Sequence, residues 1–172
     1  MRVIAGEFGG RTLESPAGES TRPTTDKVRQ AVFNSLGSSG EIDGAVVADL
    51  FAGSGALGIE ALSRGAASCV FVERDRNALR ALDANIAKLQ LADRARVVRS
   101  DVVAWVPSMR GVDLAFVDPP YAFAAWDQLL ALIQAPVVVA ESSAAITAPV
   151  GWELRRSRRY GRTWVSVLDR LA

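Results

Sequence analysis

The sequence predicts an α/β protein built on a mostly parallel, doubly wound sheet. From residue 45 onward, short apolar runs typical of buried strands alternate with segments of helical periodicity. Such an alternation places helices on both faces of one sheet. A glycine-rich turn also joins the first strand of the series to the first helix. The 172 residues suit a single domain, in which residues 1–40 form an extension and residues 41–172 form the core.

The N-terminal region predicts a small hairpin followed by one helix. Extended runs at residues 2–5 and 11–13 are joined through glycines, and a loop rich in Ser, Thr, Gly and Pro follows them. Thr24 or Thr25 can cap the next helix, because each precedes a stretch of helical apolar spacing. We expect that helix to end at Gly37.

The core elements follow from the same patterns. The predicted strands cover 46–51, 68–73, 95–100, 112–117 and 136–141, and the helices cover 56–64, 75–90 and 124–133. Two final extended runs, 152–158 and 162–170, flank Tyr160-Gly161 and predict an antiparallel hairpin on the sheet edge. The stretch 142–150 is too short for a full helix, which leaves the strand order at this edge open.

Composition excludes several kinds of chemistry. The chain has no histidine and one cysteine, so it offers neither a zinc site nor a histidine-based triad, and we expect no metal. Cys69 lies inside a predicted strand, where a buried packing role is expected. No apolar run is long enough for a membrane span or a signal peptide, which predicts a cytoplasmic protein with no membrane partner.

The glycine-rich turn predicts a binding site for an adenosine-containing cofactor. Gly53, Gly55 and Gly58 satisfy G-x-G-x-x-G, and Glu73 ends the next strand, where a carboxylate can bind ribose hydroxyls. Glycines that serve only close helix packing would give the same pattern. The pattern does not choose between a nicotinamide dinucleotide and S-adenosylmethionine, because both contain an adenosine.

Acidic residues at the carboxyl ends of the strands favour a cationic cofactor. Asp49, Glu73, Asp101 and Asp118 each end or follow a predicted strand, and open α/β sheets bind ligands at that edge. Carboxylates there would repel a pyrophosphate but attract an ammonium or a sulfonium group. Asp101, or the backbone of Val102 beside it, is also placed to meet an adenine amino group.

The tetrapeptide Asp118-Pro119-Pro120-Tyr121 closes the strand at 112–117 with a rigid turn. The prolines fix the backbone and carry no N–H, so the loop offers a carboxylate and carbonyls beside an aromatic ring. These groups suit a planar ligand that carries an NH₂. Asp118 and the Pro119 carbonyl can accept hydrogen bonds from the NH₂, while Tyr121 stacks on the face of the ligand. A proline turn after a core strand, with Tyr121 as packing, is the structural alternative.

Positive charge is concentrated at the end of the chain. The net charge is +1 overall, but residues 151–172 carry six basic and two acidic side chains. Such a cluster can track a phosphate backbone, although a solvated hairpin face would show the same composition. The arginines in this region that we consider for phosphate contact are Arg155, Arg156, Arg158, Arg159 and Arg162.

These motifs resemble those of class I S-adenosylmethionine-dependent methyltransferases that act on nitrogen, a Rossmann-like class. The segments 2–6, 22–34 and 159–163 further resemble the RsmD family, whose members methylate N2 of one guanine in 16S ribosomal RNA of the bacterial small subunit. The resemblance covers nearly the whole chain. It implies S-adenosylmethionine as cofactor, 16S rRNA as partner, and a guanine flipped into a pocket over Asp118. We also expect a monomer.

The resemblance implies three groups of site residues. The catalytic group is Asp118, Pro119, Pro120 and Tyr121. The cofactor-binding group is Asp49, Phe51, Gly53, Gly55, Gly58, Glu73, Arg74, Asp101, Val102 and Asp118. The RNA-binding group adds Arg2, Arg11, Arg22, Thr24, Lys27 and Arg29 to the terminal arginines.

Three other functions stay open at this point. Another nitrogen methyltransferase, acting on adenine N6 or a protein glutamine, would use the same pocket. A NAD-binding module would explain the glycines but not Asp118-Pro119-Pro120-Tyr121. A catalytically silent RNA-binding subunit would leave the acidic positions without a role.

Overall fold

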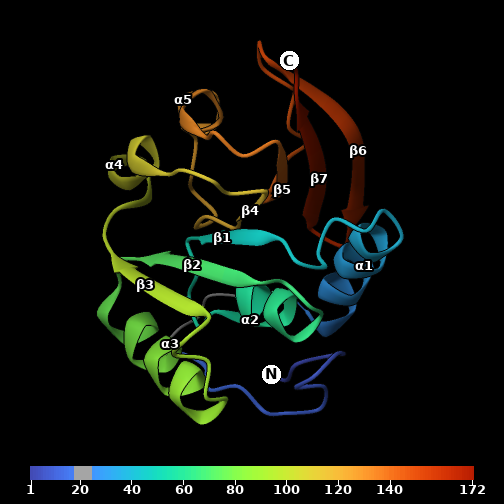
Figure 1. The fold of residues 1–172 in the computed structure, drawn as a ribbon. Helices are drawn as coiled ribbons and strands as arrows, with labels where there is room; N and C mark the ends of the chain where they lie inside the picture. Colours follow the sequence, from blue (N-terminus) through green and yellow to red (C-terminus); the bar gives the residue numbers. More distant parts are fainter. Residues whose placement is uncertain (18–24) are drawn as a thin grey trace.

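The computed structural model describes residues 1–17 and 25–172, which fold around one seven-stranded sheet (Figure 1). The strand order is β3-β2-β1-β4-β5-β7-β6. The strands are β1 (Val46–Leu50), β2 (Ser68–Glu73), β3 (Ala95–Arg99), β4 (Leu114–Val117), β5 (Val137–Ser142), β6 (Trp152–Tyr160) and β7 (Thr163–Arg170). The first five are parallel, whereas β7 runs antiparallel to β5 and β6 antiparallel to β7. The predicted fold class and its C-terminal hairpin are therefore confirmed.

Helices cover both faces of the sheet. On one face lie α1 (Asp26–Gly37), α2 (Ala56–Ser63) and α3 (Arg76–Lys88); on the other lie α4 (Val102–Trp105), the short 3-10 helix η1 (Val106–Ser108) and α5 (Trp126–Leu132). The sequence did not predict α4 or η1. Both are too short to show a helical period, and α4 begins where the Asp101 side chain accepts a hydrogen bond from the Ala104 N–H.

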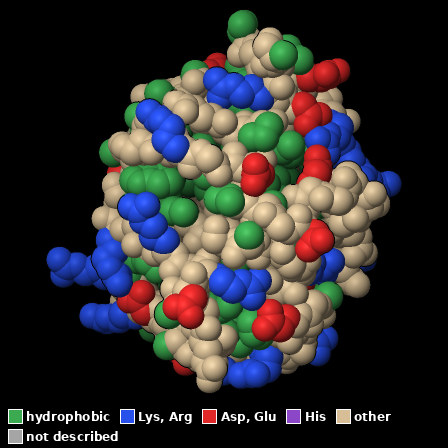
Figure 2. Space-filling view, in the orientation of Figure 1, with side chains coloured by type: hydrophobic (Ala, Val, Ile, Leu, Met, Phe, Trp, Pro, Cys, Tyr) green, Lys and Arg blue, Asp and Glu red, His purple; other side chains and the backbone are tan. Residues whose placement is uncertain are grey.

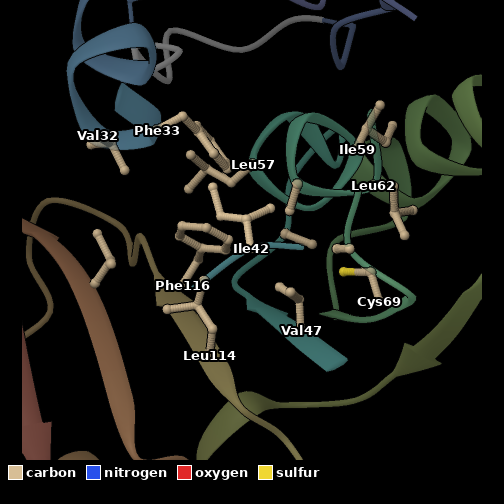
Figure 3. Close-up of a cluster of buried hydrophobic side chains, with 14 of the residues drawn as sticks. Val32, Phe33, Ile42, Val47, Leu57, Ile59, Leu62, Cys69, Leu114 and Phe116 are labelled. Carbon is tan, nitrogen blue, oxygen red and sulfur yellow. The ribbon is translucent and has the colours of Figure 1, made fainter. Parts of the chain in front are cut away.

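The larger core joins the N-terminal extension to the sheet. Figure 3 shows Phe33 of α1 beside Phe116 of β4, and Ile59 and Leu62 of α2 near the inner strands. The ring centroids of Phe33 and Phe116 are 5.2 Å apart. Cys69 is buried there, as predicted, and burial raises the pKa of its thiol well above the usual value. The described part of the N-terminal extension, residues 1–17 and 25–40, thus shares one hydrophobic core with the sheet.

The predicted N-terminal hairpin is reduced to a single antiparallel bridge between Arg2 and Thr12. Backbone hydrogen bonds from Val3 N–H to the Arg11 carbonyl and from Leu13 N–H to the Met1 carbonyl hold the two runs together. The helix that follows is confirmed: the Thr25 hydroxyl caps α1 by accepting a hydrogen bond from the Val28 N–H. Thr24, the alternative cap, lies outside the described residues.

No helix in the described ranges is both long enough and apolar enough to cross a membrane.

Candidate functional site

Two cavities share one lining residue, Asp118, which directly follows β4. The first cavity has a volume of about 870 Å³ and lies at the carboxyl ends of β1, β2 and β4. The second has a volume of about 300 Å³ and lies between α1, the end of β5 and the turn of the β6–β7 hairpin. The larger volume falls in the range of small-molecule and cofactor sites.

The four predicted acidic residues all line the first cavity. Asp49, Glu73, Asp101 and Asp118 come from different strand ends, and the parallel sheet brings them to one edge. Asp118 is half-buried, and its backbone N–H donates to the Leu50 carbonyl at 3.4 Å. A cavity walled by carboxylates suits a ligand with positive charge and disfavours a pyrophosphate.

Asp49 is the most buried of these carboxylates, with 1% of its surface exposed. Its Oδ2 accepts a hydrogen bond from the Gly58 N–H at 2.8 Å. Burial raises the pKa of Asp49 well above the usual 3.8, and the nearby charges of Asp118 and Glu73 raise it further. The folded protein therefore holds this carboxyl in an environment that penalises its ionised form.

The raised pKa predicts how Asp49→Asn changes stability. The native state binds the Asp49 proton more tightly than the unfolded state, so the free energy of unfolding falls as pH rises above about 4. The amide of the variant keeps an oxygen for the Gly58 N–H and never ionises. We expect the variant to unfold at a higher temperature than the wild type at pH 7, by roughly 2–4 °C for each kcal/mol relieved. Thermal unfolding of both proteins from pH 4 to 8 checks this. A difference in Tm between variant and wild type that does not narrow toward pH 4 would contradict it.

Glu73 fixes the glycine turn. Its Oε2 accepts from the Gly53 N–H, and its Oε1 accepts from the N–H groups of Arg74 and Asp75, each at 2.8 Å. Oε2 keeps a lone pair for a ligand, while the hydrogen bonds to Oε1 hold the carboxylate in place at the cavity wall. Arg74 lines the cavity too and pairs with Asp101 at 3.0 Å.

The three glycines of the turn have different roles. Gly53 has φ +58°, and a Cβ built there would meet no described atom within 4 Å, so its backbone faces the open cavity that it lines. At Gly55 and Gly58 a Cβ would instead lie 2.5 Å from Leu82 Cδ1 and 2.4 Å from Phe71 Cε1. Neither residue lines the cavity. Gly55 and Gly58 therefore allow close packing of α2 and α3 on the sheet.

The remaining predicted cofactor residues lie where the strand ends place them. Phe51 and Val102 line the first cavity, and Phe51 has φ +62°, which is strained for a side chain of this size. Its ring packs edge-on against that of Phe123, with the ring centroids 5.3 Å apart. Sequence reasoning missed Phe123, which also lines the cavity, although an aromatic residue so close to the proline turn was a signal for it.

The proline turn is divided between the two cavities. Pro120 lines the first cavity and Tyr121 lines the second, where 67% of the tyrosine is exposed. Pro119 is half-buried and lines neither cavity, although its neighbour Asp118 lines both. Asp118 is thus the link between the two spaces.

The second cavity contains a carboxylate that the sequence reasoning missed. Glu141 is buried to 5% exposure at the end of β5, and it lines the cavity with Lys27 and Tyr160. Its position directly after a buried strand run was the same signal that identified Asp49 and Asp118.

The structure corrects one of the predicted RNA-binding positions, Arg29, and pairs a second, Arg155, with carboxylates of the chain. Arg29 is fully buried and donates hydrogen bonds to Asp26 at 2.8 Å and to the Arg2 carbonyl, so it faces the interior of the protein. Burial lowers its pKa. Arg155 is exposed, but its guanidinium is hydrogen-bonded to the carboxylates of Asp169 and Glu41, which raise its pKa. Both guanidinium groups are committed to partners within the chain.

The remaining described basic residues of the prediction also reach the surface. Arg2, Arg11 and Lys27 are exposed, as are four arginines of the β6–β7 hairpin, Arg156, Arg158, Arg159 and Arg162. Arg22 and Thr24 lie outside the described residues. On the face seen in Figure 2, basic and acidic side chains are interspersed rather than gathered into one continuous area.

Comparison with known proteins places the chain in a family. Residues 1–169 match the family model described as "Conserved hypothetical protein 95". Ribosomal RNA small subunit methyltransferase D of Escherichia coli strain K12 is 35% identical over 100% of this chain and 91% of its own length. The solved structure of yhhF from Escherichia coli is 36% identical, with a TM-score of 0.86 over 100% of this chain and 98% of that one.

A more distant structure shares the fold alone. Magnesium protoporphyrin IX methyltransferase from Synechocystis, solved with bound S-adenosylmethionine, is 13% identical and has a TM-score of 0.67 over 84% of this chain and 79% of that one. The family match and the full-length relative both cover the glycine turn and the proline turn. The chain therefore belongs to the family of ribosomal RNA small subunit methyltransferase D.

Proposed function

We propose that this protein transfers a methyl group from S-adenosylmethionine to the exocyclic N2 of a guanine in 16S rRNA of the small ribosomal subunit. One observation carries the proposal: Asp118 lines a large cavity and a small one, so a group held in the small cavity can reach the large one beside the same carboxylate. Membership of the ribosomal RNA methyltransferase family supports the substrate class.

The first cavity fits S-adenosylmethionine. Its carboxylates complement an ammonium and a sulfonium, and its volume of about 870 Å³ accommodates a nucleoside with an amino-acid arm. In this assignment Glu73 accepts the ribose hydroxyls, and Asp101 with Val102 meets the adenine. The backbone of Gly53, which faces the cavity, and the Asp49 side chain contact the amino-acid end of the cofactor. When bound, the cofactor supplies an electrophilic methyl carbon.

The second cavity is assigned to the guanine. Asp118, which lines both cavities, accepts a hydrogen of the N2 amino group and so holds the nitrogen beside the first cavity. Tyr121, largely exposed in this structure, stacks on the base when RNA is bound. The guanine N2 is a weak nucleophile, and these contacts favour the positive charge that would develop on it as its bond to the methyl carbon forms and the bond from that carbon to the sulfonium sulfur breaks, leaving a neutral thioether. One N2 proton then passes to solvent.

The RNA-binding surface proposed here consists of the exposed arginines of the β6–β7 hairpin. Replacing Arg156, Arg158 and Arg162 together with alanine removes three cations with no carboxylate partner among the described residues. We expect the slope of log affinity against log salt to become shallower by about two. Filter binding of 16S rRNA fragments from 50 to 300 mM salt measures it.

Arg155→Ala provides the matched control, because Glu41 and Asp169 already neutralise that cation. Its salt slope should equal that of the wild type. If the triple variant has the same salt slope as the wild type, the arginines of the hairpin do not bind the RNA.

Transfer of labelled methyl from S-adenosylmethionine to ribosomal subunits lacking their methyl groups tests the function as a whole. We expect label in the RNA of the small subunit and none in that of the large subunit. Binding of NAD instead of S-adenosylmethionine, or label only in protein or DNA, would contradict the proposal.

A further inference from the structure

Residues 1–16 form part of the first cavity, although the glycine and acidic motifs lie far from them in the sequence. Met1, Ser15 and Pro16 line the cavity together with Ser54 of the glycine turn. The N-terminal segment, defined here as residues 1–16, is therefore a wall of the proposed cofactor site. Its position depends on what attaches it to the sheet domain.

Asn85 connects this segment to the glycine turn. Its Nδ2 donates to the Glu14 carbonyl and to the Ser54 carbonyl, both at 3.0 Å, and its Oδ1 accepts from the Glu14 N–H at 2.7 Å. The side chain is fully buried. Both donors and the acceptor of the amide are thus satisfied, and they bond to groups in or next to the cavity wall, since Glu14 precedes Ser15.

An asparagine at this place is unfavourable for the helix itself. Asn85 lies inside α3, three residues after Leu82, on the buried stripe that also holds Leu79. Asparagine has a lower helix propensity than leucine, and a buried amide is costly unless it is hydrogen-bonded. A leucine would serve the helix and the core better, so the residue type suits the connection to Glu14 and Ser54.

A second buried residue attaches the same segment at a different point. Ser63, 4% exposed, donates its hydroxyl to the Ala5 carbonyl at 2.5 Å and accepts from the Phe8 N–H at 2.9 Å. Neither Ala5 nor Phe8 lines the cavity. Ser63 therefore holds the segment without touching the cavity wall, whereas Asn85 holds the part that forms it.

We propose that Asn85 is a positioning residue for cofactor binding, which holds Glu14 and Ser54 so that the N-terminal segment and the glycine turn enclose one site. The proposal rests on the assignment of S-adenosylmethionine to the first cavity. Asn85 touches no reacting atom; it acts through the backbone of its two neighbours. Its loss should weaken cofactor binding and leave the chemistry of the bound complex unchanged.

Isothermal titration of S-adenosylmethionine into the wild type and into Asn85→Ala, Asn85→Leu and Ser63→Ala tests the proposal. We expect the Kd of both Asn85 variants to rise about tenfold, because two carbonyls and one N–H in or next to the cavity wall lose their partner. KM for the cofactor should rise in parallel while kcat at saturating cofactor stays at the wild-type value. Ser63→Ala should lower Tm but change Kd by less than about twofold.

Hydrogen exchange in the wild type gives a measurement that needs no variant. Cofactor binding should slow amide exchange in a peptide covering residues 10–16, because that segment encloses the ligand. The proposal is overturned by unchanged exchange there, by folded Asn85 variants that bind as the wild type does, or by Ser63→Ala weakening binding equally. A wild type that binds no S-adenosylmethionine would overturn the proposed function as well.

Discussion

Asp118→Ala should lower kcat for methyl transfer by about 10²-fold or more, because in the proposed function this carboxylate orients the amino group and favours the developing charge. Asp118 lines both cavities, but the first cavity keeps four other acidic residues, which are Asp49, Glu73, Asp75 and Asp101. Binding of S-adenosylmethionine should therefore be largely retained. Single-turnover kinetics with titration of the cofactor separates the two effects.

Two further variants sharpen this test. Asp118→Asn keeps one oxygen acceptor and should retain more activity than Asp118→Ala. Asp113→Ala, at the opposite end of β4, removes an exposed carboxylate that accepts from the Val46 N–H at 2.8 Å and lies in neither cavity. It should leave kcat unchanged. Near-normal turnover by Asp118→Ala would show that the proline turn does not orient the substrate.

Gly58→Ala should destabilise the fold by about 2 kcal/mol or more, even though alanine is the better helix former. The helix term favours alanine by about 1 kcal/mol, whereas overpacking a rigid core costs about 1–3 kcal/mol and occasionally more. The added Cβ would lie 2.4 Å from Phe71 Cε1 and 2.6 Å from Cys69 Sγ. Both neighbours are buried on β2, so we expect the steric term to exceed the helix term.

Gly37→Ala is the matched control for this prediction. Gly37 lies at the end of α1, and a Cβ built there meets no described atom within 4 Å. Alanine at this position should be neutral or stabilising by up to about 1 kcal/mol. Urea unfolding of both variants measures the difference, and equal stabilities would show that β2 moves to accept the methyl group.

Sequence patterns predicted the sheet well because its strands are short, apolar and separated by clear turn residues. The strand 68–73 matches β2 at both ends, and the acidic residues that follow strands reach one edge because parallel topology brings them there. Glu141 satisfied the same rule and could have been identified with Asp49 and Asp118.

Other features depend on tertiary contacts that local patterns do not encode. The attachment of Glu14 to Asn85 joins residues 71 positions apart, and no periodicity indicates it. The ion pair between Arg155 and Glu41 spans 114 positions. Arg29 did carry a local signal, because it precedes Phe33 by four residues and so shares the buried face of α1. Its charge alone predicts a position at the surface. Hydrogen bonds to Asp26 and to the Arg2 carbonyl instead stabilise the guanidinium inside the protein.

The most direct measurement of the central claim is the identity of the methylated nucleoside. Small ribosomal subunits lacking their methyl groups are incubated with the protein and labelled S-adenosylmethionine, and the digested RNA is separated into nucleosides. We predict that the label elutes as N2-methylguanosine. Label in N6-methyladenosine, or in any nucleoside other than a guanosine methylated at N2, would contradict the assignment of the second cavity to guanine.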